Sequence, residues 1–301
     1  MARSGSLRKA ALAMHSPREP LLCEACGYNI EKLPAHAACP ECGEPTMNSF
    51  PEFRTGSPFQ QRPRLLTWWT TNWRVLRHPR TLFRKIRIEQ RTGTQLLLAN
   101  LLIAAVFMVD PWVAVGIGDP ARTFRNAPLP LWLLVYGTTW IAEVLLGALV
   151  LLLLTRLEWY GMRFIAARRG WRITPNAAWQ VCCHSSIGWL FVGLIPLLGM
   201  AWIYIFANWF GKSPNGMLHI PGITSRPIPW MNVVNFGVLA LGFLAGMLIF
   251  ETLVYLGVRQ CKFANPADLS PSSPITPALP SRDNASANKS EHNVHPATER
   301  V

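Results

Sequence analysis

The chain has 301 residues, 50% of them hydrophobic, and it carries a net charge of +13. An ordinary soluble domain does not combine these features, whereas a membrane protein with basic flanks does. Its 13 tryptophans indicate the same class, because the indole ring favours the membrane interface. We expect no secretory signal in the first 22 residues, since the apolar stretch 10–14 is too short and Arg18 and Glu19 follow it.

Residues 1–19 are basic and unpatterned, and we expect them to be disordered. Within 20–46, Cys23, Cys26, Cys39 and Cys42 form a C-x2-C-x12-C-x2-C motif. Four thiolates satisfy tetrahedral Zn²⁺ and leave no position for water, so this spacing predicts a structural zinc ribbon. The segment is too short to bury a core, and metal binding would supply most of its folding free energy. Disulfides or unrelated thiols are the alternatives.

A glycine follows each cysteine pair, at Gly27 and Gly43, where a turn that brings two thiolates to one ion needs a positive φ. Paired thiolate ligands require a reducing compartment, which predicts a cytosolic amino terminus. Four glutamates and one lysine lie within 23–44, a net charge of −3. Phosphate repels an acidic module, so we do not expect nucleic-acid binding, and a protein-docking or structural role is favoured.

A linker over 47–63 leads to the basic, aromatic-rich stretch 64–91, RLLTWWTTNWRVLRHPRTLFRKIRIEQR. Such a stretch beside a membrane span predicts interfacial amphipathic helices that lie on anionic headgroups. Pro79 suits the first turn of the second helix. The alternative is a pair of cytosolic helices that pack on the rest of the protein by one face.

Four long apolar runs follow, and they predict an all-α transmembrane bundle over 92–258. The runs are 95–117, 131–154, 179–210 and 231–257. The third is too long for one ordinary span, so it is either one kinked helix or a tight hairpin around GLIPLLG. The bundle therefore has four or five spans.

Positive charges orient the bundle, because cytosolic loops carry an excess of lysine and arginine. Residues 54–91 hold ten such residues and the loop 155–178 holds five, so both are expected inside. The loop 211–230 and the stretch just after the last run each carry two basic residues, so charge does not decide on which side the carboxyl terminus lies. Residues 259–301 are expected to form a disordered tail, since 264–301 are rich in Pro, Ser, Ala and Asn and lack apolar periodicity.

The segment RVLRHPRTLFRKI and the later run SSIGWLFVGLIPLLGMAW resemble the Yip/Yif family of multi-span membrane proteins. The likeness covers roughly 74–257, through the His-Pro-Arg entry at 78–83 and the Pro and Gly of 195–199. It implies five spans, a cytosolic amino terminus and, in eukaryotic members, association with small GTPases in vesicle trafficking, but no catalytic residues. Separately, residues 21–43 are similar to short zinc ribbons at the head of many bacterial membrane proteins, which implies the bacterial inner membrane. The ribbon and the polar tail depart from the Yip/Yif pattern.

Four ionisable side chains lie within the apolar runs: Asp110, Glu143, His184 and Glu251. Such groups cost several kcal/mol to bury and tend to face a bundle interior. By the rise of a helix, Glu143 lies about 18 Å deep from one surface and His184 about 9 Å from the other, so the two could meet as a hydrogen-bonded pair. The alternative is separate satisfaction by groups such as Thr139 and Ser185.

Asp110 precedes Pro111 and is expected at an interfacial turn, while Glu251 could snorkel or pair with Arg259. Cys182 and Cys183 adjoin His184, but buried cysteine usually behaves as a small hydrophobe. The chain contains no phosphate loop, serine-nucleophile elbow or HExxH motif.

We therefore expect a non-enzymatic membrane scaffold. Its partners would be anionic lipid headgroups, a protein at the cytosolic face and, as a further option, copies of itself. The alternative is a small transporter or channel subunit that uses Glu143 and His184.

Overall fold

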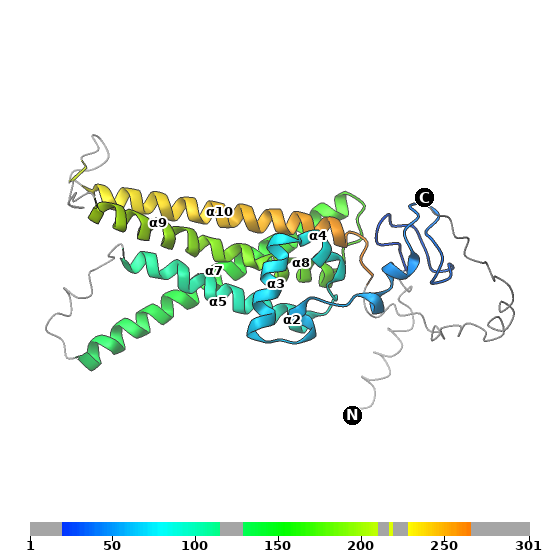
Figure 1. Ribbon diagram of the computed structural model, residues 1–301, viewed down its shortest axis with the longest axis horizontal. Coiled ribbons are helices and arrows are strands. Elements are labelled where there is room, and N and C mark those ends of the chain that lie inside the picture. Colours follow the sequence, from blue (N-terminus) through cyan, green and yellow to red (C-terminus); the bar gives the residue numbers. More distant parts are fainter. Residues whose placement is uncertain (1–19, 115–128, 210–216, 219–227, 266–301) are drawn as a thin grey trace, which may run out of the picture. The chain divides into compact units, whose positions relative to one another are not determined.

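The computed structural model describes residues 20–114, 129–209, 217–218 and 228–265 (Figure 1). The predicted disordered amino terminus lies outside these residues. A short paired-strand element joins the third and fourth long helical segments, with Met217 opposite Pro229 and Leu218 opposite Ile228. In chain order the elements are η1 (Thr46–Ser49), η2 (Pro51–Phe53), α2 (Pro58–Gln61), α3 (Leu65–Arg77), α4 (Pro79–Lys85), α5 (Gln90–Ala114), α7 (Leu129–Arg168), α8 (Pro175–Ser185), η3 (Ser186–Trp189), α9 (Leu190–Trp209), β1 (Met217–Leu218), β2 (Ile228–Pro229) and α10 (Trp230–Cys261).

Four segments of the described chain are long and apolar enough to cross a membrane: Arg91–Val109, Gly137–Arg168, Pro175–Ile203 and Val233–Cys261. This is the lower of the two numbers expected. The third is one interrupted helix rather than a hairpin: α8 passes through the 3-10 turn η3 into α9, which contains Pro196. The interruption therefore lies before GLIPLLG, at residues 186–189.

Two predicted boundaries shift in the structure. Helix α7 continues to Arg168 and α8 begins at Pro175, so the expected loop 155–178 narrows to 169–174. Helix α10 runs to Cys261, and Ala264 and Asn265 are buried. The start of the disordered tail at 259 was therefore placed too early, and the rest of the predicted tail lies outside the described residues.

The core of the bundle is a continuous apolar cluster to which α3, α4, α5, α7, α8, η3, α9 and α10 contribute. Its buried members include Phe83, Ile86, Leu97, Leu101, Leu151, Val181, Trp189 and Phe250. Helices α9 and α10 lie side by side (Figure 1). Close approach depends on small residues, as is usual between membrane helices. A Cβ at Gly193 of α9 would lie 2.4 Å from a backbone carbon of Phe107 in α5, and a Cβ at Gly246 of α10 would lie 2.7 Å from the backbone nitrogen of Val192.

Helix α3 buries polar side chains and exposes several large apolar ones. Its buried face consists of Thr71, Asn72 and Val75. Asn72 exchanges side-chain hydrogen bonds of 3.0 and 3.2 Å with Asn100 of α5, and the Trp68 indole N–H also donates to Asn100. The outward face carries the exposed side chains of Leu65, Leu66, Trp69 and Trp73. In water this arrangement would leave apolar groups solvated, whereas beside lipid it buries them.

Helix α4 begins at Pro79, as predicted, and turns its buried Leu82 and Phe83 toward α10. The predicted linker 47–63 is also packed. Its Phe50 joins the core of the cysteine module, and Ser57 caps α2 by accepting a hydrogen bond from the Gln60 backbone N–H. The segment therefore connects the module to the helices through ordered turns.

Candidate metal centre

Two loops of the same construction carry the cysteines. In the first, the Gly27 N–H donates to the Cys23 carbonyl at 2.8 Å; in the second, the Gly43 N–H donates to the Cys39 carbonyl at 2.8 Å. The two glycines have φ values of 86° and 73°, in the left-handed region that favours glycine. The C-x2-C-G pattern therefore folds twice into the turn that the sequence predicted.

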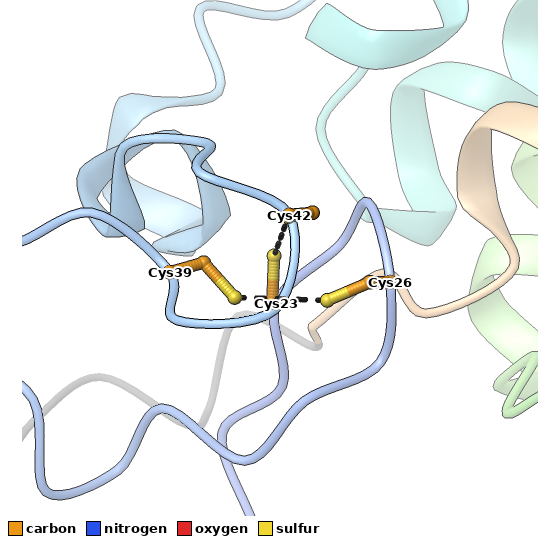
Figure 2. A group of neighbouring side chains, drawn as sticks. All are labelled: Cys23, Cys26, Cys39 and Cys42. Atoms are coloured by element: carbon orange, nitrogen blue, oxygen red, sulfur yellow. Dashed lines mark hydrogen bonds between the residues drawn. The ribbon is translucent and has the colours of Figure 1, made fainter.

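The four thiols converge on one point (Figure 2). All four Sγ atoms lie within 4.8 Å of one another, and Cys23–Cys42 and Cys26–Cys39 are each 3.6 Å apart. A tetrahedral ion with metal–sulfur bonds of about 2.3 Å requires sulfur–sulfur separations of about 3.8 Å. A disulfide requires about 2.05 Å. The four free cysteines therefore form a site that could bind a metal ion.

The surroundings favour the thiolate at Cys39 but not at Cys26, where burial raises the pKa of the thiol. Cys23 and Cys39 are buried, Cys26 is half-buried and Cys42 is exposed. Burial raises the pKa of Cys39, but backbone N–H groups of Cys42 and Glu41 outweigh it and bring the pKa to about 7. A thiolate held by backbone donors is the form that binds metal. The apolar core beside the site is small, consisting of Leu21, Ile30 and Phe50.

Asn265 joins the cysteine module to the end of α10. Its Nδ2 donates to the backbone oxygens of Leu22 and Ser49, both at 2.7 Å, and its Oδ1 accepts from the Leu22 N–H at 3.1 Å. Arg172, between α7 and α8, donates to the same Oδ1 at 2.8 Å. The Asn265 backbone N–H donates to Glu24 at 3.1 Å. One buried asparagine thus connects the module with two helix ends.

A buried ion pair reinforces this connection. Arg54 is 3% exposed and binds the Glu24 carboxylate through two nitrogens, at 2.6 and 3.2 Å. Its third nitrogen donates to the Ile86 carbonyl at 2.9 Å. Burial raises the pKa of Glu24, and the Arg54 guanidinium opposes that effect. We call the set Leu22, Glu24, Ser49, Arg54, Arg172 and Asn265 the ribbon junction; no local pattern in the sequence predicts these contacts.

The predicted pair of Glu143 and His184 is wrong. His184 is fully buried, and its ring nitrogens contact the Gln180 carbonyl at 2.9 Å and Ser57 Oγ at 3.1 Å. Glu143 is exposed on α7. The partner of His184 is a serine 127 positions away in the predicted linker. This agrees with the alternative, in which other polar groups form the hydrogen bonds of His184, but the serine is Ser57 and not Ser185.

The other ionisable groups also differ from expectation. Glu251 does not pair with Arg259 but lies beside Glu158 of α7. The Arg259 guanidinium lies 5.8 Å from the Tyr255 ring centroid. The backbone of Asp110 is helical, because α5 continues to Ala114, so the expected turn at this position is wrong. The side chain of Asp110 lies outside the described residues. Cys182 and Cys183, which were predicted to behave as small hydrophobic residues, are both buried.

Comparison of the chain with protein-family models, curated proteins and solved structures found no match. The Yip/Yif-like resemblance therefore stays a prediction.

Proposed function

We propose that this protein is a non-enzymatic scaffold of the bacterial inner membrane that holds a zinc ribbon at the cytosolic end of a four-span bundle as a docking site for a partner protein. The observation that carries the proposal is the ribbon junction. A module meant only to fold on its own needs no buried ion pair and no asparagine linking it to two helix ends. A docking module gains from both, because rigid attachment lowers the entropy lost when a partner binds.

Zinc is the proposed metal because of the donor set. Four cysteine thiolates at near-tetrahedral separations suit Zn²⁺ or iron, and a closed site with no water suits a structural ion. In this site Cys23, Cys26, Cys39 and Cys42 would hold the ion, and the ion would supply folding free energy that the small core cannot. One zinc per chain in the purified protein, measured by elemental analysis, supports this assignment; stoichiometric iron contradicts it.

The exposed surface of the ribbon is acidic. Glu31, Glu41 and Glu44 are exposed, whereas Glu24 is used in the ribbon junction. Complementary charge steers association and selects the partner. We therefore propose a partner with a basic contact surface.

The basic stretch that precedes the first span supports the proposed orientation. The exposed Leu65, Leu66, Trp69 and Trp73 of α3 would enter the interface, while the neighbouring arginines meet anionic headgroups. This places the ribbon beside the cytosolic surface, where a soluble partner can reach it.

Co-purification tests the proposal. The full-length protein, solubilised in mild detergent, should retain a cytosolic partner that is lost on Glu31→Lys/Glu41→Lys/Glu44→Lys. The triple variant should keep its zinc and its unfolding midpoint, because none of the three side chains belongs to the ribbon junction. Cys23→Ser should lose zinc and partner together. A partner retained by both variants contradicts docking through the ribbon.

Transport is the alternative function, and two observations favour it. The third span is interrupted at η3, and the bundle brings Glu158 and Glu251 together, in place of the expected Glu143 and His184. Interrupted helices and carboxylates within spans are features of transporters. Proton flux into liposomes that Glu251→Gln abolishes supports transport. Wild-type flux no greater than that of protein-free liposomes, or flux that Glu251→Gln leaves unchanged, counts against it.

A further inference from the structure

A recess between α4 and α10 gathers three arginines. Arg80 and Arg84 of α4 line it together with Leu256, Arg259 and Gln260 of α10, and it encloses about 200 Å³. We call these five residues the arginine recess. None of them belongs to the metal centre or to the ribbon junction.

The arginines are brought together by close packing of the two helices. Gly257 of α10 lies against the Phe83 ring of α4, where a Cβ would come within 3.0 Å of the ring. The Cys261 thiol also donates to the Phe83 carbonyl at 3.5 Å. The approach of α4 to α10 is therefore part of the core and does not depend on the exposed arginines themselves.

The recess concentrates positive charge that the described part of the chain does not neutralise. Among described residues the ion pair found is that of Glu24 and Arg54, and no carboxylate pairs with Arg80, Arg84 or Arg259. Arg84 instead donates to Gln260 Oε1 at 2.8 Å. This hydrogen bond orients the Arg84 side chain, and the Gln260 amide NH₂ adds a further donor to the recess. Like charges spaced by four residues on one helix, as in Arg80 and Arg84, repel. An anion would relieve that repulsion.

The donor set fits a phosphate group. A guanidinium group forms paired hydrogen bonds with phosphate oxygens. Several guanidinium groups together match the charge of a phosphate better than the charge of a single carboxylate. Leu256 adds an apolar wall to the recess. The recess lies in the last two turns of the fourth candidate span, which ends at Cys261. Lipid phosphates lie at this level of a bilayer.

We propose that the arginine recess is a specific binding site for the phosphate of an anionic membrane lipid. This goes beyond the diffuse attraction of the basic stretch 64–91, because it assigns the headgroup to named residues on two helices. It is independent of the proposed docking function.

Lipid titration of the full-length protein, followed by native mass spectrometry, tests the site. The probes are phosphatidylglycerol, phosphatidylcholine and inorganic phosphate. The wild type should bind phosphatidylglycerol in preference to phosphatidylcholine. Arg84→Gln/Arg259→Gln should weaken phosphatidylglycerol binding at least about tenfold, since one charged hydrogen bond of ordinary strength corresponds to that factor. Arg163→Gln/Arg168→Gln is the matched control: it removes the same charge from exposed positions on α7 and should change binding by less than about twofold.

Three results would overturn the proposal. Equal weakening in both double variants would mean diffuse surface attraction. Equal binding of phosphatidylglycerol and phosphatidylcholine would show that the site does not select an anionic lipid. Saturation of the site by inorganic phosphate at the same concentration as the lipid would assign the site to a free anion.

The variant Arg84→Lys/Arg259→Lys covers the case in which the glutamine variant does not fold. It keeps the charge and loses the paired donors of the guanidinium, so binding should fall to an intermediate level. Wild-type affinity in the lysine variant would contradict a site built on arginine geometry.

Discussion

At the scale of single residues, Asn265 and Arg54 hold the cysteine module against the helices through several buried hydrogen bonds. Each is buried, and each links segments distant in the sequence: the contacts of Asn265 span up to 243 positions. A buried polar group is stable only when its hydrogen bonds are made, so these residues stabilise one arrangement of the ribbon and disfavour others.

Asn265→Ala should loosen the cysteine module and leave the four proposed metal ligands in place. The change leaves the Leu22 and Ser49 backbone groups without their partner, at a cost of about 1–3 kcal/mol for each buried group. Hydrogen exchange at residues 21–50 should accelerate, while the metal content stays constant. The control is Asn48→Ala, whose side chain makes an exposed hydrogen bond to Glu44. If the two variants exchange alike, Asn265 does not hold the ribbon.

Arg54→Met should destabilise the protein by about 3–5 kcal/mol, because it leaves the Glu24 carboxylate buried and unpaired. The double variant Glu24→Leu/Arg54→Met removes both charges and should recover most of that loss. The free energy of unfolding, measured for both single variants and the double variant, gives the coupling. Additive losses would show that the two side chains act independently.

At the scale of elements, the packing of α9 against α5 and α10 depends on glycine. Two of these glycines, Gly242 and Gly246, are four residues apart on α10, and a Cβ at Gly242 would lie 2.3 Å from the Pro196 ring. Between membrane helices such spacing allows the backbones to approach and pack closely. The orientation of α3 belongs to the same scale, since the contacts of Trp68 and Asn72 to Asn100 leave Trp69 and Trp73 on the exposed face.

Gly193→Ala should destabilise the bundle by about 1–3 kcal/mol, because the added methyl group meets the backbone of α5 and cannot be relieved by a side-chain movement. Gly237→Ala is the matched control, since a Cβ there meets nothing within 4 Å. The unfolding midpoint in detergent distinguishes the two. A midpoint for Gly193→Ala equal to that of the control would mean that α5 and α9 are further apart.

At the scale of the whole molecule, the ribbon junction constrains the topology. If the four candidate segments cross a membrane, the contact between Leu22 and Asn265 places the cysteine module and the end of α10 on one side of it. Arg172, between α7 and α8, contacts Asn265 as well, so this loop lies on that side too. An even number of crossings satisfies both contacts, which agrees with the four candidate spans.

Reporters fused before Met1 and after Val301 should therefore lie on the same side, and the cytosol is the side expected from the arginine distribution. A reporter inserted at residue 220, between the third and fourth spans, should lie on the opposite side. Activity of compartment-specific reporters in whole cells measures this. Opposite sides for the two ends would favour the fifth span that the Yip/Yif resemblance implies.

The local patterns of the chain were sufficient for several features. The cysteine spacing with its glycines predicted both turns and the cluster of thiols, because each turn depends on residues close in the sequence. The apolar runs predicted the spans, because length and hydropathy alone decide whether a helix can cross a bilayer. Pro79 predicted the start of α4 for the same local reason.

Only the tertiary structure decided which buried polar groups meet. From depth alone Glu143 could reach His184, but the rotation of α7 turns Glu143 outward, and Ser57 occupies the place beside the imidazole. The ribbon junction and the arginine recess likewise join residues from opposite ends of the chain. Such contacts depend on how helices pack and rotate, which periodicity within one helix does not specify. The sequence by itself therefore determined four helices able to cross a membrane and a preceding four-cysteine module that could bind a metal ion, and the packing decided that this module contacts the end of the last helix.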